Sequence, residues 1–312
     1  MYNSIITESE LMDSDVVFTS LMESVGLSTE VINEAFDIRG FINRIKELLK
    51  KLLERVRSFF FKKRANCNRI YEYLNKLYRD NYDIIKKNYN TDWSIQGYTY
   101  DDLDAVIGNT YNVFKNKVDM LTVKKIQDDI DNNKYMRNND NNINSYNDML
   151  LSSISKAIGH DNIYNNTSEL VHGIYLYARH SESPIKISKR NYYLGNIEDI
   201  IRGKEYKPIE LCTRLSNDIQ MQIQEDLKHL ETLERNLQND QDSMDKRSYM
   251  QLGIKCISFQ KSLLSSMLDA FINLCTEELN QTKKIIELLI HLKNDNIGAK
   301  NEMGIFTECS FI

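Results

Sequence analysis

The chain has 312 residues, which is enough for two ordinary domains or for one domain with long helical arms. Only 2 prolines and 11 glycines interrupt it, so long helices need few breaks and a mainly α-helical fold is expected. A net charge of -5 argues against nucleic-acid binding by the surface as a whole, so any such binding has to be local.

The cysteines and the N-terminus bear on the compartment. No two cysteines form a C-x-x-C pair, and the five are far apart: Cys67, Cys212, Cys256, Cys275 and Cys309. This spacing predicts reduced packing residues rather than a disulfide framework or a zinc site. The sequence has neither a signal peptide nor a run of about 18 uncharged apolar residues. We therefore expect a protein made in a cytoplasm, with no transmembrane segment.

Residues 1–38 form an acidic N-terminal segment with eight acidic residues and no Lys or Arg. Such a charge run is typical of a solvated tail, here with a short helix expected around residues 28–36. The alternative is that the segment is a partner for the basic helix that follows it.

Residues 39–64 reverse the charge, with ten basic residues and two acidic ones. Their apolar residues recur at three-and-four spacing, which predicts an amphipathic helix with one apolar stripe and with nearly all bases on the other face. The apolar docking stripe comprises Phe41, Ile45, Leu48, Leu49, Leu52, Leu53, Val56, Phe59 and Phe60, and Phe61 falls off it. The bases predicted to face a partner, a membrane or phosphates are Arg44, Lys46, Lys50, Lys51, Arg55, Arg57, Lys62, Lys63 and Arg64.

Something has to cover the apolar stripe, because burying about ten such side chains is worth roughly 15 to 30 kcal/mol gross. Three partners fit. They are other helices of this chain or of a neighbouring subunit, an anionic membrane surface on which residues 41–61 lie as an in-plane helix, and packaged DNA, whose phosphates residues 39–64 would neutralise. The stripe by itself does not choose between them.

The middle of the chain predicts several smaller elements. A Tyr-rich helix is expected from Arg69 to Asn88 and a short strand within residues 92–100; with the basic helix they make up the region 39–130. Residues 131–149 are rich in Asn and predict a polar connector and the best internal boundary. Residues 150–207 predict a small mixed α/β region, with a strand pair after Ser183.

Residues 208–295 predict a long antiparallel helical hairpin, followed by a tail at 296–312. The first helix starts near Pro208, and the second is longer and more apolar than the first can cover. We therefore expect an elongated molecule with the hairpin as its spine and Phe271 in the buried seam. The basic helix either docks along this spine or swaps to a neighbouring subunit.

No pattern in the chain points to catalysis. It contains no H-E-x-x-H, G-x-x-x-x-G-K-[ST], G-x-G-x-x-G or G-x-S-x-G motif. Adjacent carboxylates such as Asp101 and Asp102 point about 100° apart on a helix, so they do not form an acid–base pair. We expect no enzyme, no cofactor, no metal site and no small-molecule substrate.

The order of these features resembles a group of helical structural proteins in the virions of large tailed bacteriophages of low-GC hosts. The resemblance rests on four phrases in this order: LSTEVINEAFD, FINRIKELLKKLLERVRSFFFKK, GYTYDDLD and YMQLGIKCISFQKSLLSSMLDAF. It implies a virion component, internal or otherwise particle-associated, that assembles through its helices with other virion proteins or with itself. Maturation proteases of such particles often cut after patterns matched at residues 21–23 and 28–30, so removal of the N-terminal segment is a further hypothesis.

Overall fold

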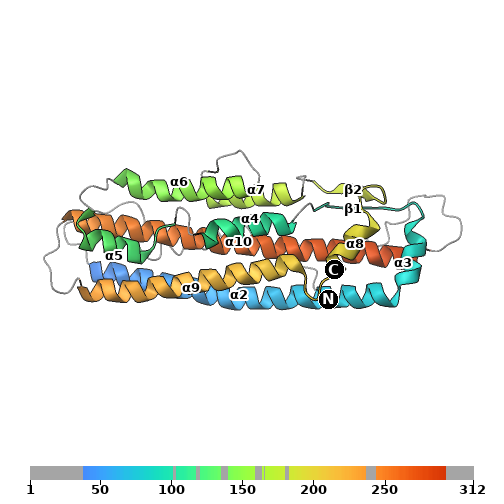
Figure 1. Ribbon diagram of the computed structural model, residues 1–312, viewed down its shortest axis with the longest axis horizontal. Helices are drawn as coiled ribbons and strands as arrows, with labels where there is room; N and C mark the ends of the chain where they lie inside the picture. The colour runs from blue at the N-terminus through green and yellow to red at the C-terminus, as the bar shows by residue number, and fades with distance from the viewer. Residues whose placement is uncertain are drawn as a thin grey trace, which may run out of the picture.

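The computed structural model describes residues 38–100, 103–116, 120–134, 140–158, 164, 166–179, 183–236 and 244–292. Within these ranges the chain forms nine helices and two short strands, which confirms the predicted mainly helical fold. Most helices lie along one long axis, so the molecule is elongated (Figure 1). The helix expected around residues 28–36 and the two protease patterns lie outside the described residues.

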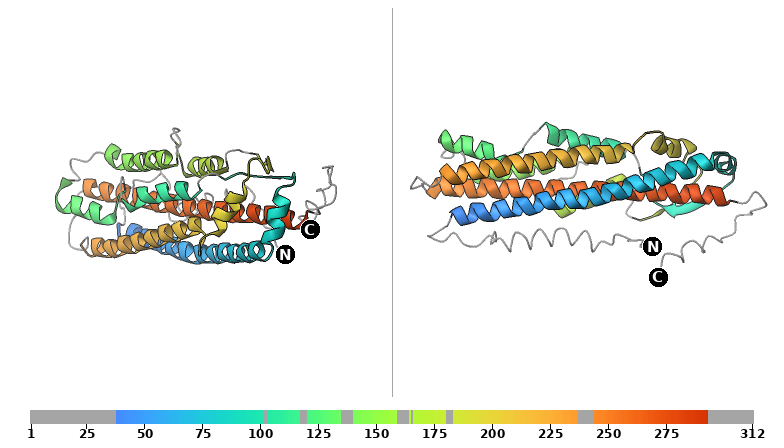
Figure 2. Two further views of the ribbon diagram at one scale, coloured as in Figure 1. Left: turned by 45° about the vertical axis from the view of Figure 1, so that its right-hand side comes forward. Right: turned by 90° about the horizontal axis from the view of Figure 1, so that it is seen from below.

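Three long helices form the spine: α2 (Ile38–Asp80), α9 (Lys207–Asn236) and α10 (Met244–His291). At about 1.5 Å per residue, the 48 residues of α10 span roughly 70 Å. Helices α9 and α10 run antiparallel, and α2 packs along both of them (Figure 2). The predicted C-terminal hairpin is confirmed, and the basic helix docks on the hairpin of its own chain.

Helix α2 is longer than predicted because it joins the basic helix to the Tyr-rich helix. No Pro or Gly occurs between Phe41 and Asp80, so nothing in the backbone interrupts the helix there. The break comes at Asn81, whose side-chain amide donates a hydrogen bond to the carbonyl of Leu77 (2.9 Å). The short helix α3 (Tyr82–Tyr89) follows. The predicted boundary between two helices near residue 69 is therefore wrong.

Shorter helices cover the side of the α9–α10 hairpin that faces away from α2 (Figures 1 and 2). They are α4 (Leu103–Lys115), α5 (Val123–Asp131), α6 (Asp140–Ala157) and α7 (Thr167–Arg179). Helix α8 (Leu194–Ile201) packs against α2 instead. The apolar surface of α10 that α9 leaves open is thus covered within the chain.

The Asn-rich connector is shorter than predicted. Residues 140–149 form the first half of α6, so they are helical rather than a connector, although the described side chains at 145–149 are half-buried or exposed. The second half of this helix buries Leu150, Leu151 and Ile154 against α4 and α10. Because a helix gains most of its stability from packing one apolar face, this burial outweighs the modest helix propensity of Asn.

The strand prediction was half right. Strand β1 (Ser94–Gly97) lies where a short strand was expected, but its partner is β2 (Ile185–Ser188), about 90 residues later in the chain. The two are antiparallel, with Gly97 opposite Ile185. The expected strand pair within the region after Ser183 is therefore wrong. A Cβ atom at Gly97 would clash with the side chain of Gln281 on α10, so the glycine lets β1 approach that helix closely.

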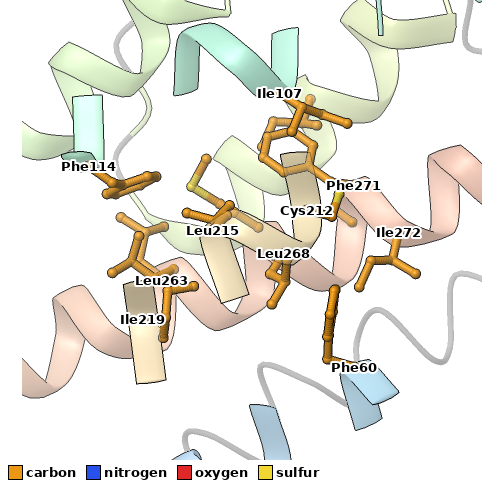
Figure 3. Close-up of a cluster of buried hydrophobic side chains, with 14 of the residues drawn as sticks. Phe60, Ile107, Phe114, Cys212, Leu215, Ile219, Leu263, Leu268, Phe271 and Ile272 are labelled. Carbon is orange, nitrogen blue, oxygen red and sulfur yellow. The ribbon is translucent and has the colours of Figure 1, made fainter. Parts of the chain in front are cut away.

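One continuous apolar core runs between the layers, and Phe271 is fully buried in it, as predicted. Figure 3 shows this part of the core, with side chains from four helices: Phe60 of α2, Ile107 and Phe114 of α4, Cys212, Leu215 and Ile219 of α9, and Leu263, Leu268, Phe271 and Ile272 of α10. The three long helices and the shorter helices that pack on them therefore share one core.

Candidate interaction surface

The apolar stripe of α2 is buried by the chain itself. Helices α9 and α10 cover it. Seven residues of the predicted stripe are buried, and Ile42, which lies one turn before Ile45 and Lys46, is buried with them; the seven are Ile45, Leu48, Leu49, Leu52, Leu53, Val56 and Phe60. The side chains of Phe41 and Phe59, which were also predicted to belong to it, lie outside the part of the chain that the structure describes. Of the three predicted partners, helices of the same chain therefore cover the stripe.

This burial bears on the membrane alternative. A membrane would bury the stripe as well, so α2 itself would gain little from leaving the bundle. The facing residues of the hairpin, among them Leu268 and Ile272, which lie toward Phe60 of α2 (Figure 3), would then be exposed. Each such side chain costs about 1.5 to 3 kcal/mol to expose, so the transfer is unfavourable unless these residues also find cover.

Three of the bases predicted to face a partner turn toward the hairpin instead. The contacts are Lys46 with Glu234, Arg55 with Asp269 at 3.5 Å, and Lys63 Nζ with Asn273 Oδ1 at 2.5 Å. Burial raises the pKa of Asp269 to about 6, while the charges of Lys63 and Arg55 oppose the rise. The prediction is therefore corrected for Lys46, Arg55 and Lys63, whose polar ends are engaged within the chain.

The other predicted bases point outward. Arg44, Lys50, Lys51, Arg57 and Lys62 are exposed, and Arg64 is partly exposed. Two acids, Glu47 and Glu54, share the exposed surface with them. Within it, Lys50 Nζ donates to Glu47 Oε1 at 3.0 Å, and Arg57 Nε donates to Gln220 Oε1 of α9 at 3.2 Å. The exposed bases outnumber the acids by five to two, so this surface is positive.

Three of the outward bases are aligned. Seven helical residues make about two turns and eleven make about three, so Arg44, Lys51 and Lys62 lie on one line along α2. Their spacing along the helix is roughly 10 and 17 Å. Neither Lys51 nor Lys62 is in an ion pair with a described residue. We call the exposed residues Arg44, Lys50, Lys51, Arg57, Phe61 and Lys62 the outer basic face.

Phe61 is the most exposed large apolar side chain among the described residues, at 73%. It lies one turn after Arg57 and directly before Lys62, and at intervals of seven residues it falls on the same line of α2 as the acids Glu47 and Glu54. The sequence pattern had already set it apart, because it is the apolar residue that falls off the stripe. This large ring lies among charged side chains and, being exposed, contributes little to the packing of the bundle.

A polar cluster that the sequence did not reveal joins the end of α7 and the segment after β1 to α10. Arg179 at the end of α7 donates two hydrogen bonds to Glu277 of α10, at 3.0 and 2.6 Å. The hydroxyl of Tyr100 donates to the same carboxylate at 3.0 Å. The guanidinium also stacks on the rings of Tyr98 and Tyr175, at 4.6 and 4.7 Å from their centroids. The bidentate pair neutralises both charges, so the cluster serves docking rather than acid–base chemistry.

The neighbouring residue Glu278 points into a different environment. Its carboxyl is buried, which raises its pKa to about 8, and the charge of Asp104 adds to the rise. The hydroxyl of Tyr206 donates a hydrogen bond to it. A carboxyl in this state is mostly protonated at neutral pH. No spacing in the sequence distinguishes Glu278 from Glu277, because burial decides the difference.

A small cavity lies where α5 meets α9 and α10. Its volume is about 100 Å³, and its lining includes Thr122, Gln222, Asp226, His229 and Lys261. The fully buried Lys261 ammonium lies 3.3 Å from the Asp226 carboxylate, which also accepts a hydrogen bond from the backbone N–H of Val123 (3.1 Å). Ligand pockets usually exceed about 300 Å³, so this one has room for a few water molecules only. The ion pair joins α9 to α10, and the hydrogen bond from Val123 holds the start of α5 against this hairpin.

The described cysteines are free thiols in the core, as the spacing predicted: Cys67, Cys212, Cys256 and Cys275. Burial raises the pKa of Cys67 to about 11, although a hydrogen bond with Thr276 opposes the rise. Burial also raises the pKa of Cys256, to about 12. Since the thiolate is the reactive form, these two are poor nucleophiles at neutral pH.

Three further observations concern what the chain could bind or resemble. No helix in the described ranges is both long and apolar enough to cross a membrane. Among the same residues, no group of three His, Cys, Asp or Glu side chains is placed to hold a metal ion. The chain matches no protein-family model, no curated protein and no solved structure.

Proposed function

We propose that the chain is a non-catalytic structural protein of a bacteriophage particle, which acts through contacts between its helices and neighbouring components. The spine carries this proposal. Three helices, the longest spanning about 70 Å, pack side by side on one continuous core and are braced by shorter helices. Such a rod keeps its ends at a set distance, which a spacer or scaffold requires. The order of sequence phrases that resembles virion proteins supports the phage setting.

The outer basic face is the surface through which we propose that this rod meets a neighbour. The apolar stripe of α2 is covered within the chain, whereas the outer basic face is exposed on its surface. The partner is another virion protein, a second copy of this chain or packaged DNA. The alternative function is an in-plane membrane helix at residues 41–61. The burial of the apolar stripe within the chain argues against it.

Mass spectrometry of purified particles tests the proposal. The protein should be recovered in constant proportion to the major structural proteins after density-gradient purification, whereas abundant host proteins should fall away. Disruption of the particles into shells, tails and released contents should then place it in one fraction. Its consistent absence from intact particles would refute the virion role.

A matched pair of variants tests the surface. We expect the double variant Lys51→Glu and Lys62→Glu to enter particles poorly, because it reverses charge on the outer basic face. The control carries the same charge change at exposed lysines elsewhere, Lys186 of β2 and Lys284 of α10. Equal incorporation of both variants would show that α2 does not mediate assembly. Binding of the unaltered chain to anionic liposomes would favour the membrane alternative.

A further inference from the structure

We propose that residues 1–37 of the same chain bind the outer basic face of α2 and compete with external polyanions for it. This inference goes beyond the proposed function, because it concerns the chain's own segment and does not require a place in a particle. It is carried by the charge of the two surfaces, by the exposed ring of Phe61, and by the point at which the segment joins α2.

The two surfaces are complementary in charge. Residues 1–37 contain eight acids and no Lys or Arg, while the outer basic face and its surroundings hold five exposed bases and two acids. One exposed ion pair contributes only about 0.2 to 1 kcal/mol. Several pairs spread over the length of the face add to one another, and the attraction is screened beyond about 10 Å at 0.1 M salt. The contact is therefore weak per pair and sensitive to salt.

The apolar pattern favours this segment over a purely charged ligand. Phe61 is 73% exposed, and burying such a ring is worth about 1.5 to 3 kcal/mol. The acids of the segment alternate with apolar residues, as in VVF at 16–18, LM at 21–22 and AF at 35–36. The segment thus supplies apolar cover for the ring, which lies in line with Glu47 and Glu54, and negative charge for the neighbouring bases, which outnumber these two acids.

The covalent link makes a weak contact sufficient. Helix α2 begins at Ile38, so the segment joins the chain about 9 Å before Arg44 along the helix. Phe61 lies roughly 35 Å from this junction, within reach of a segment of 37 residues even at about 1.5 Å per residue. A tether of this kind gives an effective concentration on the order of 1 mM, so an intrinsic Kd near 1 mM already fills the face half of the time.

Photo-crosslinking from position 61 tests the contact in the full chain. A p-benzoylphenylalanine replaces Phe61, ¹⁵N-labelled and unlabelled chains are mixed, and crosslinked peptides are identified by mass spectrometry. We expect crosslinks to residues 1–37 of the same isotopic chain, with a yield that falls in 1 M salt. The control probe replaces Tyr193, which is 63% exposed on another part of the molecule, and should not give them. Mixed-isotope crosslinks, or none to this segment, would overturn the proposal.

Binding of a fluorescein-labelled single-stranded DNA oligonucleotide tests the competition. The full-chain variant with Glu23→Gln, Glu30→Gln and Glu34→Gln should bind the oligonucleotide about tenfold more tightly at low salt, because the face is released. The control variant has Glu72→Gln, Glu205→Gln and Glu231→Gln, three exposed acids in the folded part, and carries the same net charge. An equal gain in both variants would show that only net charge matters and would refute the competition. Particle incorporation is measured separately, so this result leaves the proposed function intact.

Discussion

Two interfaces hold elements against α10, and they are built in opposite ways. Helix α2 packs on the hairpin through a regular stripe of eight described apolar side chains, so its contact is spread over its length. Helix α7 also buries an apolar face that includes Leu170 and Ile174, but its end and the segment after β1 contact α10 through a polar cluster centred on Arg179 and Glu277. The first interface tolerates small changes at many sites. The polar cluster depends on a few directional bonds, and removing one partner leaves the others unpaired.

Placing a charge in the apolar interface should have the largest effect. We expect Leu49→Glu to lower the free energy of unfolding by about 4 kcal/mol, because Leu49 is fully buried and the carboxylate would have no partner there. Phe271→Asp, in the same core, should act similarly. Urea denaturation followed by circular dichroism measures both.

The matched control is the adjacent exposed residue. Lys50→Glu puts the same charge one position further along α2, where it should change stability by only about 0.5 kcal/mol. If Leu49→Glu were no more harmful than Lys50→Glu, α2 would not dock on the hairpin as described.

Breaking the polar cluster should cost less, and the cost should depend on the partner. Arg179→Met removes the cation and leaves Glu277 partly buried with an unpaired charge, so we expect a loss of about 2 to 3 kcal/mol. Adding Glu277→Gln should restore part of that loss. A double-mutant cycle on thermal unfolding gives the coupling, and purely additive effects would mean that the two side chains do not interact.

The neighbouring carboxyl should make stability depend on pH. Burial raises the pKa of Glu278 from 4.5 to about 8, so the folded state keeps a proton that the unfolded chain has lost. The resulting stabilisation is complete below pH 4.5 and is lost as the pH rises through 8. Between pH 6.5 and 8 the free energy of unfolding should fall by about 1.5 kcal/mol from this group.

The variant Glu278→Gln isolates this contribution. Gln does not titrate, so the difference between the unaltered chain and the variant should change by that amount across the same pH range. A constant difference, measured by urea denaturation at several pH values, would show that Glu278 has an ordinary pKa in the folded protein.

The smallest effect is expected where β1 approaches α10. Gly97→Ala introduces a Cβ that meets the Gln281 side chain, and we expect a loss of about 1 kcal/mol. Because the obstacle is a side chain rather than backbone, adding Gln281→Ala should relieve the clash. If the double variant lost as much as the sum of the single ones, the close approach would not be the cause.

Regular patterns made part of the fold predictable. The apolar stripe and the hairpin follow from a repeat of three and four residues, which one helix presents wherever its partner is. The exposed position of Phe61 follows from the same repeat. The boundaries were less predictable. The strand pairing of β1 with β2 joins segments about 90 residues apart, and the Asn-rich start of α6 is held by packing that its own composition does not show.

The candidate surface was also predictable from the sequence only in part. The sequence correctly indicated a basic side of α2, but it could not separate Lys46, Arg55 and Lys63, which contact the hairpin, from Lys51 and Lys62, which point outward. Residues on the edge of a helix turn inward only if a neighbouring helix offers a polar partner, here Glu234, Asp269 and Asn273.

By itself, the sequence determined that the fold is mainly helical, which side of each long helix is apolar, and where charge is concentrated, because these properties depend on residues a few positions apart. Only the tertiary structure decided that α9 and α10 of the same chain cover the apolar stripe. It alone decided that Arg179 meets Glu277 and that Glu278 holds a proton. Those outcomes depend on burial and on side chains from distant segments, and free energies of that kind arise only when the segments come together.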